Sequence, residues 1–80
     1  MNQELMDRLN AIFQDIFDDE TLTVNQNTTA KDIEDWDSLS HITLIGAVED
    51  EFGMKFSMKD VVDMQNVGEM IAIITARRKR

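Results

Sequence analysis

The chain has 80 residues, of which 16 are acidic and 8 basic, and its formal net charge at pH 7 is −8. This length allows one small domain, and the absence of cysteine and proline excludes a disulfide framework, a thiolate metal site and a collagen-like chain. Four basic residues lie at 77–80, which leaves residues 1–76 with a charge of −12, so we expect a body that repels nucleic acid and attracts basic protein surfaces.

No targeting or membrane segment is evident in the sequence. The N-terminus reads Met1-Asn2-Gln3-Glu4, with neither a basic region nor a continuous apolar stretch, so we expect no secretory signal. The apolar runs elsewhere are a few residues long, far shorter than a membrane span. We therefore expect a cytoplasmic protein that binds neither membranes nor nucleic acid.

Residues 3–17 have the apolar periodicity of an amphipathic helix. Residues 18–36 lack it and are rich in Asp, Thr and Asn, whose side chains hydrogen-bond locally and compete with helix formation. Within them, Thr29 and Asp32 resemble a capping box for a single helical turn ending at Ile33. The apolar positions of the first segment are Leu5, Leu9, Ile12 and Ile16, widened by Met6, Phe13 and Phe17.

Three further helix starts are indicated by capping residues. Asp37 predicts a helix over about 38–52, which Gly53 ends. The remaining signals predict a short helix through Val62 and a last helix beginning near Asn66. The capping pairs are Ser57 with Asp60 and Asn66 with Glu69. The apolar face expected for the second helix consists of Ile42, Leu44, Ile45, Val48 and Phe52.

These elements predict an all-α fold. We expect a small four-helix bundle, with three main helices, a short third one and a long loop between the first two. No internal repeat is evident, so we expect residues 1–80 to form a single domain. The basic tail, 77–80, is a candidate for disorder.

Ser38 is the first candidate functional residue. If Asp37 is the N-cap, Ser38 is the first helical residue, and its hydroxyl lies where the helix dipole favours a phosphate. Both residue types are also common at helix starts that have no function, and position alone leaves both readings open. His41, the only histidine, is expected on the apolar side of the helix, as a half-buried packing residue.

Several other chemistries fit the sequence poorly. A Ser/His hydrolase lacks a nucleophile elbow, an orienting carboxylate and enough chain for a cleft. A calcium loop starting at Asp32 would need glycine where Asp37 stands and glutamate where Thr43 stands. A chain with one histidine and no cysteine cannot build a structural zinc site.

Trp36 either anchors the loop on the helices or contacts a partner beside Ser38.

Taken together, the predicted elements and their motifs resemble the acyl carrier protein family over nearly the whole chain. The stretches that carry the resemblance are Asp37-Ser38-Leu39 at a helix start, Glu49-Asp50-Glu51-Phe52-Gly53 at its end, and Asn66-Val67-Gly68 at the start of the last helix. The acidic composition and the length of the chain agree with it.

The resemblance implies a carrier without catalytic activity or a metal site of its own. Ser38 would receive 4′-phosphopantetheine from coenzyme A through a magnesium-dependent phosphopantetheinyl transferase. The thiol of that arm would hold acyl groups as thioesters. Asp37 would help to position the serine and the metal during the transfer.

The resemblance also implies partner enzymes that load and unload the carrier, with basic docking surfaces. Leu39 and Ile42 would contact these partners, together with the charged Glu49 and Asp50 and the aromatic Trp36. Such contacts are expected to be transient and salt-sensitive. We expect the carrier to be a monomer.

Three departures from the family pattern point to a specialised pathway rather than bulk fatty-acid synthesis. Residues 38–48 contain no acidic side chain, the glycine common before the Asp-Ser-Leu motif is missing, and the tail is basic. A peptidyl or aminoacyl carrier uses the same serine and stays an alternative. An acidic helical adaptor that is never modified is the alternative from a different class.

Overall fold

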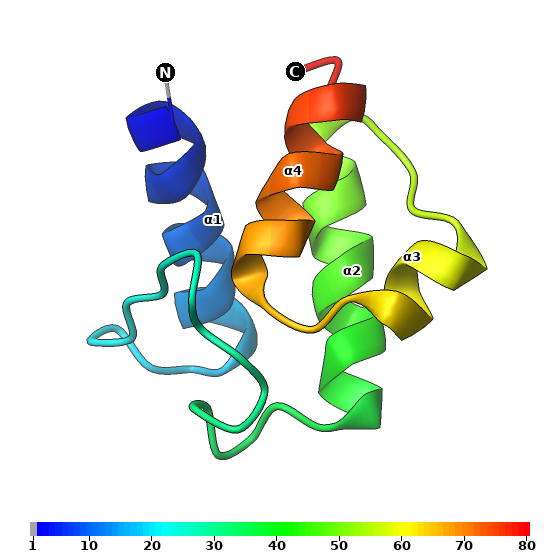
Figure 1. The fold of residues 1–80 in the computed structure, drawn as a ribbon. Helices are drawn as coiled ribbons and strands as arrows, with labels where there is room; N and C mark the ends of the chain where they lie inside the picture. The colour runs from blue at the N-terminus through cyan, green and yellow to red at the C-terminus, as the bar shows by residue number, and fades with distance from the viewer. Residues whose placement is uncertain (1) are drawn as a thin grey trace.

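The computed structural model describes residues 2–80, which form four helices and no strand. The helices are α1 (Asn2–Ile16), α2 (Ser38–Phe52), α3 (Met58–Asp63) and α4 (Val67–Arg77). α1, α2 and α4 form the bundle, and the short α3 lies to one side of it (Figure 1). The predicted all-α fold and the long first loop are thus confirmed. Within residues 2–80, no helix is both long enough and apolar enough to cross a bilayer.

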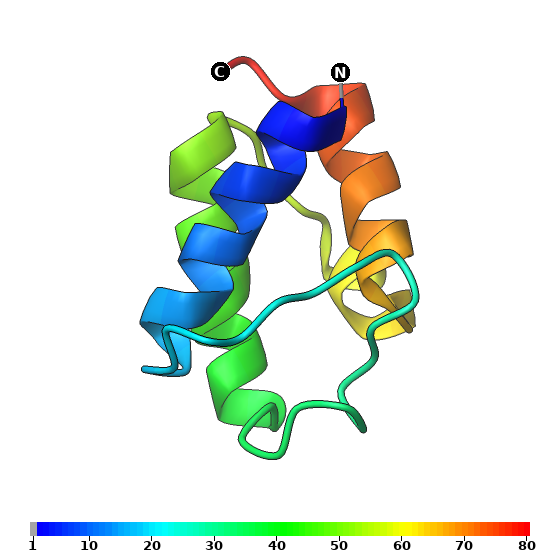
Figure 2. The same ribbon diagram turned by 90° about the vertical axis from the view of Figure 1, so that its left-hand side faces the viewer.

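The direction of the helices places the start of α2 at one end of the molecule. α1 runs away from the end that holds both chain termini, and α2 and α4 run back towards it (Figures 1 and 2). Ser38, the first residue of α2, therefore lies at the end of the bundle opposite the termini.

The core is formed by one face of each main helix and by apolar residues of the connections. Ile42, expected on the buried face of α2, is instead exposed. It precedes Leu44 by two residues, which is more than half a turn around the helix, so the two side chains point to different sides. The buried apolar residues are Leu5, Leu9, Phe13, Val24, Ile33, Trp36, Leu44, Ile45, Val48, Phe52, Met54, Val67, Met70 and Ile74.

The long loop between α1 and α2 is fixed to the bundle through its backbone. Near its start, the N–H of buried Val24 donates to the side-chain oxygen of Asn10, at 2.7 Å. Farther along, loop carbonyls accept the first N–H groups of α4: Val67 donates to Thr28 at 2.9 Å, and Gly68 to Gln26 at 2.8 Å. These N–H groups have no partner inside their own helix, so the loop completes the start of α4.

The single helical turn predicted at Thr29 to Ile33 is a hydrogen-bonded turn rather than a helix. The N–H of Asp32 donates to the carbonyl of Thr29 at 3.0 Å, and the N–H of Thr29 donates to the Asp32 carboxylate at 2.9 Å. The two residues pair as the capping motif suggested, and a separate turn follows, in which the N–H of Trp36 donates to the carbonyl of Ile33 at 3.1 Å.

The basic tail contacts the ends of α1 and α2. The N–H groups of Lys79 and Arg80 donate to the carbonyl of Phe52, at 2.8 and 3.1 Å. The guanidinium of Arg78 donates two hydrogen bonds of 3.0 Å to the carboxylate of Glu4 and lies over the Phe52 ring. In the structure, residues 78–80 thus connect the end of α4 to two other helices.

Candidate functional site

Ser38 presents an exposed hydroxyl at the first position of α2. Within residues 2–80, no hydrogen bond engages its side chain, whereas the nearby hydroxyl of Ser40 has several partners. Its position at the start of a 15-residue helix gives a phosphate on this oxygen a favourable helix dipole.

Asp37 is the N-cap of α2, as predicted. Its backbone is extended, with φ −116° and ψ −170°, and its carboxylate accepts the N–H of Ser40 at 3.0 Å. In return, the Ser40 hydroxyl oxygen accepts the N–H of Asp37 at 2.8 Å, which completes a reciprocal capping box.

The same capping bonds set the charge beside Ser38. The N–H of Ser40, and then its hydroxyl, donate to Asp37 and lower the pKa of that carboxyl group below its ordinary value. Asp37 is therefore ionised at neutral pH. Among the residues described, no three acidic or histidine side chains gather to hold a metal, so Asp37 could supply only part of a coordination shell.

Trp36 is 9% exposed and anchors the loop in the core. Its ring meets Phe13 edge to face with centroids 5.3 Å apart, and it lies 6.3 Å from Phe17. Its indole N–H donates to Nδ1 of His41 at 3.0 Å. Anchoring, one of the two readings of this residue, is therefore what the structure shows, and a contact with a partner stays a prediction.

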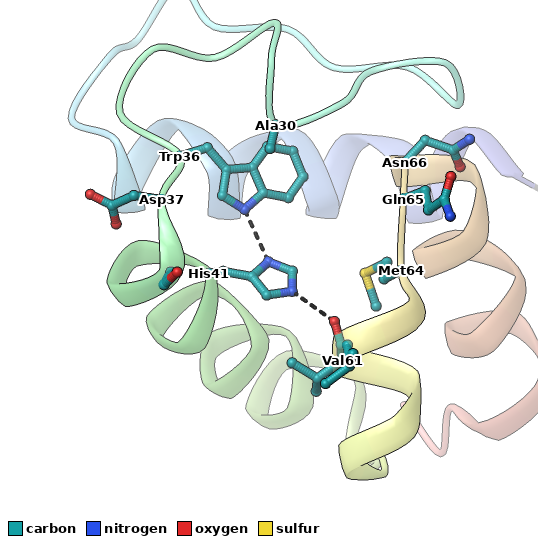
Figure 3. Close-up of a pocket in the computed structure, with 10 residues that line it drawn as sticks. Ala30, Trp36, Asp37, His41, Val61, Met64, Gln65 and Asn66 are labelled. Atoms are coloured by element: carbon teal, nitrogen blue, oxygen red, sulfur yellow. Dashed lines mark hydrogen bonds between the residues drawn. The ribbon is translucent and has the colours of Figure 1, made fainter.

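His41 joins three segments of the chain. It is half-buried, as expected, and its ring lies between Trp36 and α3 (Figure 3). The indole N–H can only donate, so Nδ1 must accept and Nε2 must carry the hydrogen. Nε2 then donates to the carbonyl of Val61 in α3, at 3.4 Å.

A hollow of about 350 Å³ opens beside Ser38. Its volume is at the lower end of the range of roughly 300–1,000 Å³ typical of small-ligand clefts. Ser38 and Asp37 lie on its lining, together with residues from the loop, from α2, from α3 and from the segment after α3 (Figure 3). Its other main lining residues are Ala30, Trp36, His41, Val61, Val62 and Met64.

Four large apolar side chains near the start of α2 and along α3 are exposed. Leu39 and Ile42 come from α2, and Met58 and Val62 from α3, with exposed fractions from 62% to 79%. Leu39 and Ile42 were predicted to contact partners, but Met58 and Val62 were missed. Their spacing of four residues on a short helix was the available signal, because that spacing places both on one side.

Glu49 and Asp50 lie near the far end of α2, about 18 Å along the helix from Ser38. The Glu49 carboxylate accepts the N–H of Phe56 at 2.9 Å, and 18% of its side chain is exposed. Asp50 is exposed. The structure therefore separates these two candidates from Ser38. Trp36, Asp37 and Leu39 are its neighbours in the sequence, and the first two also line the same hollow.

Comparisons with known proteins agree with this geometry. The family model described as "Phosphopantetheine attachment site" matches residues 7–74. The solution NMR structure of a holo acyl carrier protein from Geobacter metallireducens is similar, with a TM-score of 0.84 and 35% sequence identity. The match covers 90% of this chain and 83% of that one.

Proposed function

Because this chain belongs to the phosphopantetheine attachment site family, whose members are carriers and not catalysts, we propose that Ser38 is the residue that receives 4′-phosphopantetheine. The observation that carries the proposal is its exposed hydroxyl, without a hydrogen-bond partner in residues 2–80, at the first position of α2 and on the lining of a hollow. The attached phosphate would lie at a helix N-terminus, where negative charge is stabilised.

The attachment step follows from the chemistry of a serine and a diphosphate. Ser38 Oγ attacks the phosphorus on the pantetheine side of coenzyme A, and the new oxygen–phosphorus bond forms as the diphosphate bond breaks. The hydroxyl proton passes to a base of the transferase, and adenosine 3′,5′-bisphosphate leaves. Ionised Asp37, directly before Ser38, would contribute a carboxylate to the transferase's magnesium, because Mg²⁺ binds one or two carboxylates together with phosphate oxygens.

When bound, the group supplies a thiol that holds acyl groups as thioesters. This chain has no cysteine, so that thiol would be its only one. We propose that Leu39 and Ile42, with Met58 and Val62, contact the transferase and the acyl-transferring partners. Exposed apolar side chains on the first turns of α2 and on α3, whose Val62 lines the same hollow as Ser38, suit such contacts.

We further propose that residues 1–80 act as one discrete, monomeric carrier domain in the cytoplasm, in a specialised pathway rather than bulk fatty-acid synthesis. The specialised pathway is supported by the first part of α2, because residues 38–48 carry no acidic side chain and Ser40 takes part in the capping box. A carrier for peptidyl or aminoacyl groups would use the same serine.

The test is the mass of the intact protein after incubation with coenzyme A and a broad-specificity transferase. The wild type should gain one phosphopantetheine, and Ser38→Ala should gain nothing. Ser40→Ala and Ser57→Ala change the other two serines and should still be modified. An unchanged wild-type mass, with a transferase active on another carrier, would contradict the proposal and favour the unmodified adaptor.

A further inference from the structure

Part of the lining of the hollow beside Ser38 is a row of hydrogen-bonded groups. The row runs from the indole of Trp36 through the ring of His41 to the carbonyl of Val61 (Figure 3). It therefore crosses from the loop to α2 and on to α3. We call this row the Trp36–His41–Val61 bridge.

The three residues of the bridge line the same hollow as Ser38, so a chain attached to Ser38 that enters the interior from the hollow on this side meets the bridge. To pass it, an alkyl chain would have to separate His41 from Val61 or from Trp36. Either movement would leave a partly buried indole N–H or a backbone carbonyl without its partner, and such unpaired groups are unfavourable away from water.

The space behind the bridge is occupied. Trp36 packs against Phe13, which is completely buried, as are Leu44 and Val48 of α2. Densely packed interiors admit additional methylene groups only by shifting side chains or backbone. A long alkyl chain therefore has no prepared space among the helices.

We infer that the hollow binds a short acyl group and that the Trp36–His41–Val61 bridge excludes longer alkyl chains from the interior. The inference rests on the proposed attachment at Ser38. The hollow itself is apolar along Ala30, Val61 and Met64, which suits the first carbons of an acyl chain. Carbons beyond those that fit would extend into solvent.

The indole N–H of Trp36 reports on the bridge, because the chain has a single tryptophan and its side-chain signal in a ¹H–¹⁵N spectrum is unambiguous. The transferase would load ¹⁵N-labelled protein from coenzyme A thioesters of acetyl, butyryl, hexanoyl and octanoyl groups. We expect the signal to shift progressively from acetyl to hexanoyl, with no further shift for octanoyl. A shift that continues to grow at octanoyl, or no shift with any group, would overturn the inference.

The mass of each sample tests the attachment to Ser38 separately from the binding of the acyl group in the hollow. A protein that gains no mass refutes attachment, and the inference with it. A protein that gains the expected mass but shows one of the overturning signal patterns refutes only the inference.

Two variants test the bridge and the hollow separately. His41→Ala removes the central group of the bridge but keeps the reporter, so its signal should continue to shift through octanoyl. Ala30→Leu adds a larger side chain on the lining of the hollow and replaces no group of the bridge, and it should abolish the shift on butyryl loading. Ala72→Leu adds the same side chain on α4 and should leave the shift unchanged.

The Ala30→Leu pair keeps the inference testable even if His41→Ala does not fold, because Ala30 is exposed and carries no hydrogen bond of the bridge. Equal shifts in Ala30→Leu and Ala72→Leu would overturn the placement of the acyl group in the hollow.

Discussion

Ser40 uses its hydroxyl entirely within the protein. The oxygen accepts the N–H of Asp37, and the O–H has two alternative acceptors, the carbonyl of Asp35 at 2.9 Å and the carboxylate of Asp37 at 3.2 Å. Ser40 thereby fixes Asp35 and Asp37, which lie on either side of Trp36 just before Ser38. An acidic side chain at position 40 would bring a second negative charge close to Asp37. With serine there, the capping box forms and the first turn of α2 carries no carboxylate.

The carboxylate of Glu4 forms ion pairs with Arg8 and Arg78, and their contribution to the stability of the fold should be lost in acid. The guanidinium groups of Arg78 and then Arg8 donate to it and lower its pKa from 4.5 to about 2. Because the folded-state pKa is depressed, the stabilisation is fully present above pH 4.5 and is lost as the pH falls through about 2.

Glu4→Gln should therefore be less stable than the wild type at neutral pH. The difference in the free energy of unfolding should shrink below pH 4.5 and vanish near pH 2, as measured by urea denaturation across that range. Asp7→Asn on the same helix is the control, because Asp7 accepts only from the neutral amide of Gln3 in residues 2–80. A difference that stays constant from pH 6 to pH 2 would contradict the role of the arginines.

At the scale of the elements, the start of α4 depends on a glycine that allows the loop to approach. A Cβ on Gly68 would lie 2.8 Å from the backbone carbonyl of Gln26, which accepts the N–H of Gly68 at the same distance. No real side chain tolerates that contact, so the loop would have to move and the hydrogen bond would weaken.

Gly68→Ala should consequently destabilise the fold by about 1–3 kcal/mol, the usual cost of an overpacked site. Gly46→Ala is the matched control, because a Cβ there meets nothing within 4 Å and the residue lies inside α2. Alanine at position 46 should stabilise by about 0.5–1 kcal/mol through its helix propensity. Urea denaturation followed by circular dichroism measures both changes, and equal effects of the two substitutions would refute the close approach.

The helices could be predicted closely because their boundaries depend on short-range chemistry. Asp37, Ser57 and Asn66 each accept a backbone N–H three residues ahead, so a local pattern was enough to place the three helix starts. The contacts between α4 and the loop could not be predicted in this way. They join Gln26 and Thr28 to residues about forty positions away, and no local pattern specifies such a pairing.

The same distinction holds for the site. The choice of Ser38 as a candidate followed from its immediate neighbours, whereas the bond from His41 to Val61 depends on where α3 packs. Val62 was missed for that reason as well, because its place beside Ser38 on the lining of the hollow follows from the fold and not from its own helix.

At the scale of the whole molecule, the charges are separated along the bundle. The loop that leads to Ser38 carries exposed Asp32, Glu34 and Asp35, whereas the basic tail lies at the other end. In residues 2–80, the ion pairs join Glu4, Glu49, Glu51 and Asp60 to basic groups and leave the loop carboxylates out. The end that holds Ser38 therefore carries carboxylates without an ion-pair partner among residues 2–80, as do Asp7 and Asp50 nearer the termini.

This separation predicts which carboxylates guide a basic partner. Glu34→Gln combined with Asp35→Asn should lower kcat/KM for phosphopantetheine transfer by about threefold or more at low ionic strength, and the loss should fade as salt is added. The matched control combines Asp7→Asn with Asp50→Asn, which removes the same charge from the opposite end. Equal losses in both double variants would show that only net charge matters.

Both ends of the chain emerge on the side of the molecule that faces away from Ser38 (Figures 1 and 2). A support or a fused protein joined at either end would therefore leave the serine pointing outward. The fold is thus suited to display on beads, surfaces or scaffolds in either orientation, with the end that holds Ser38 still open to an approaching enzyme.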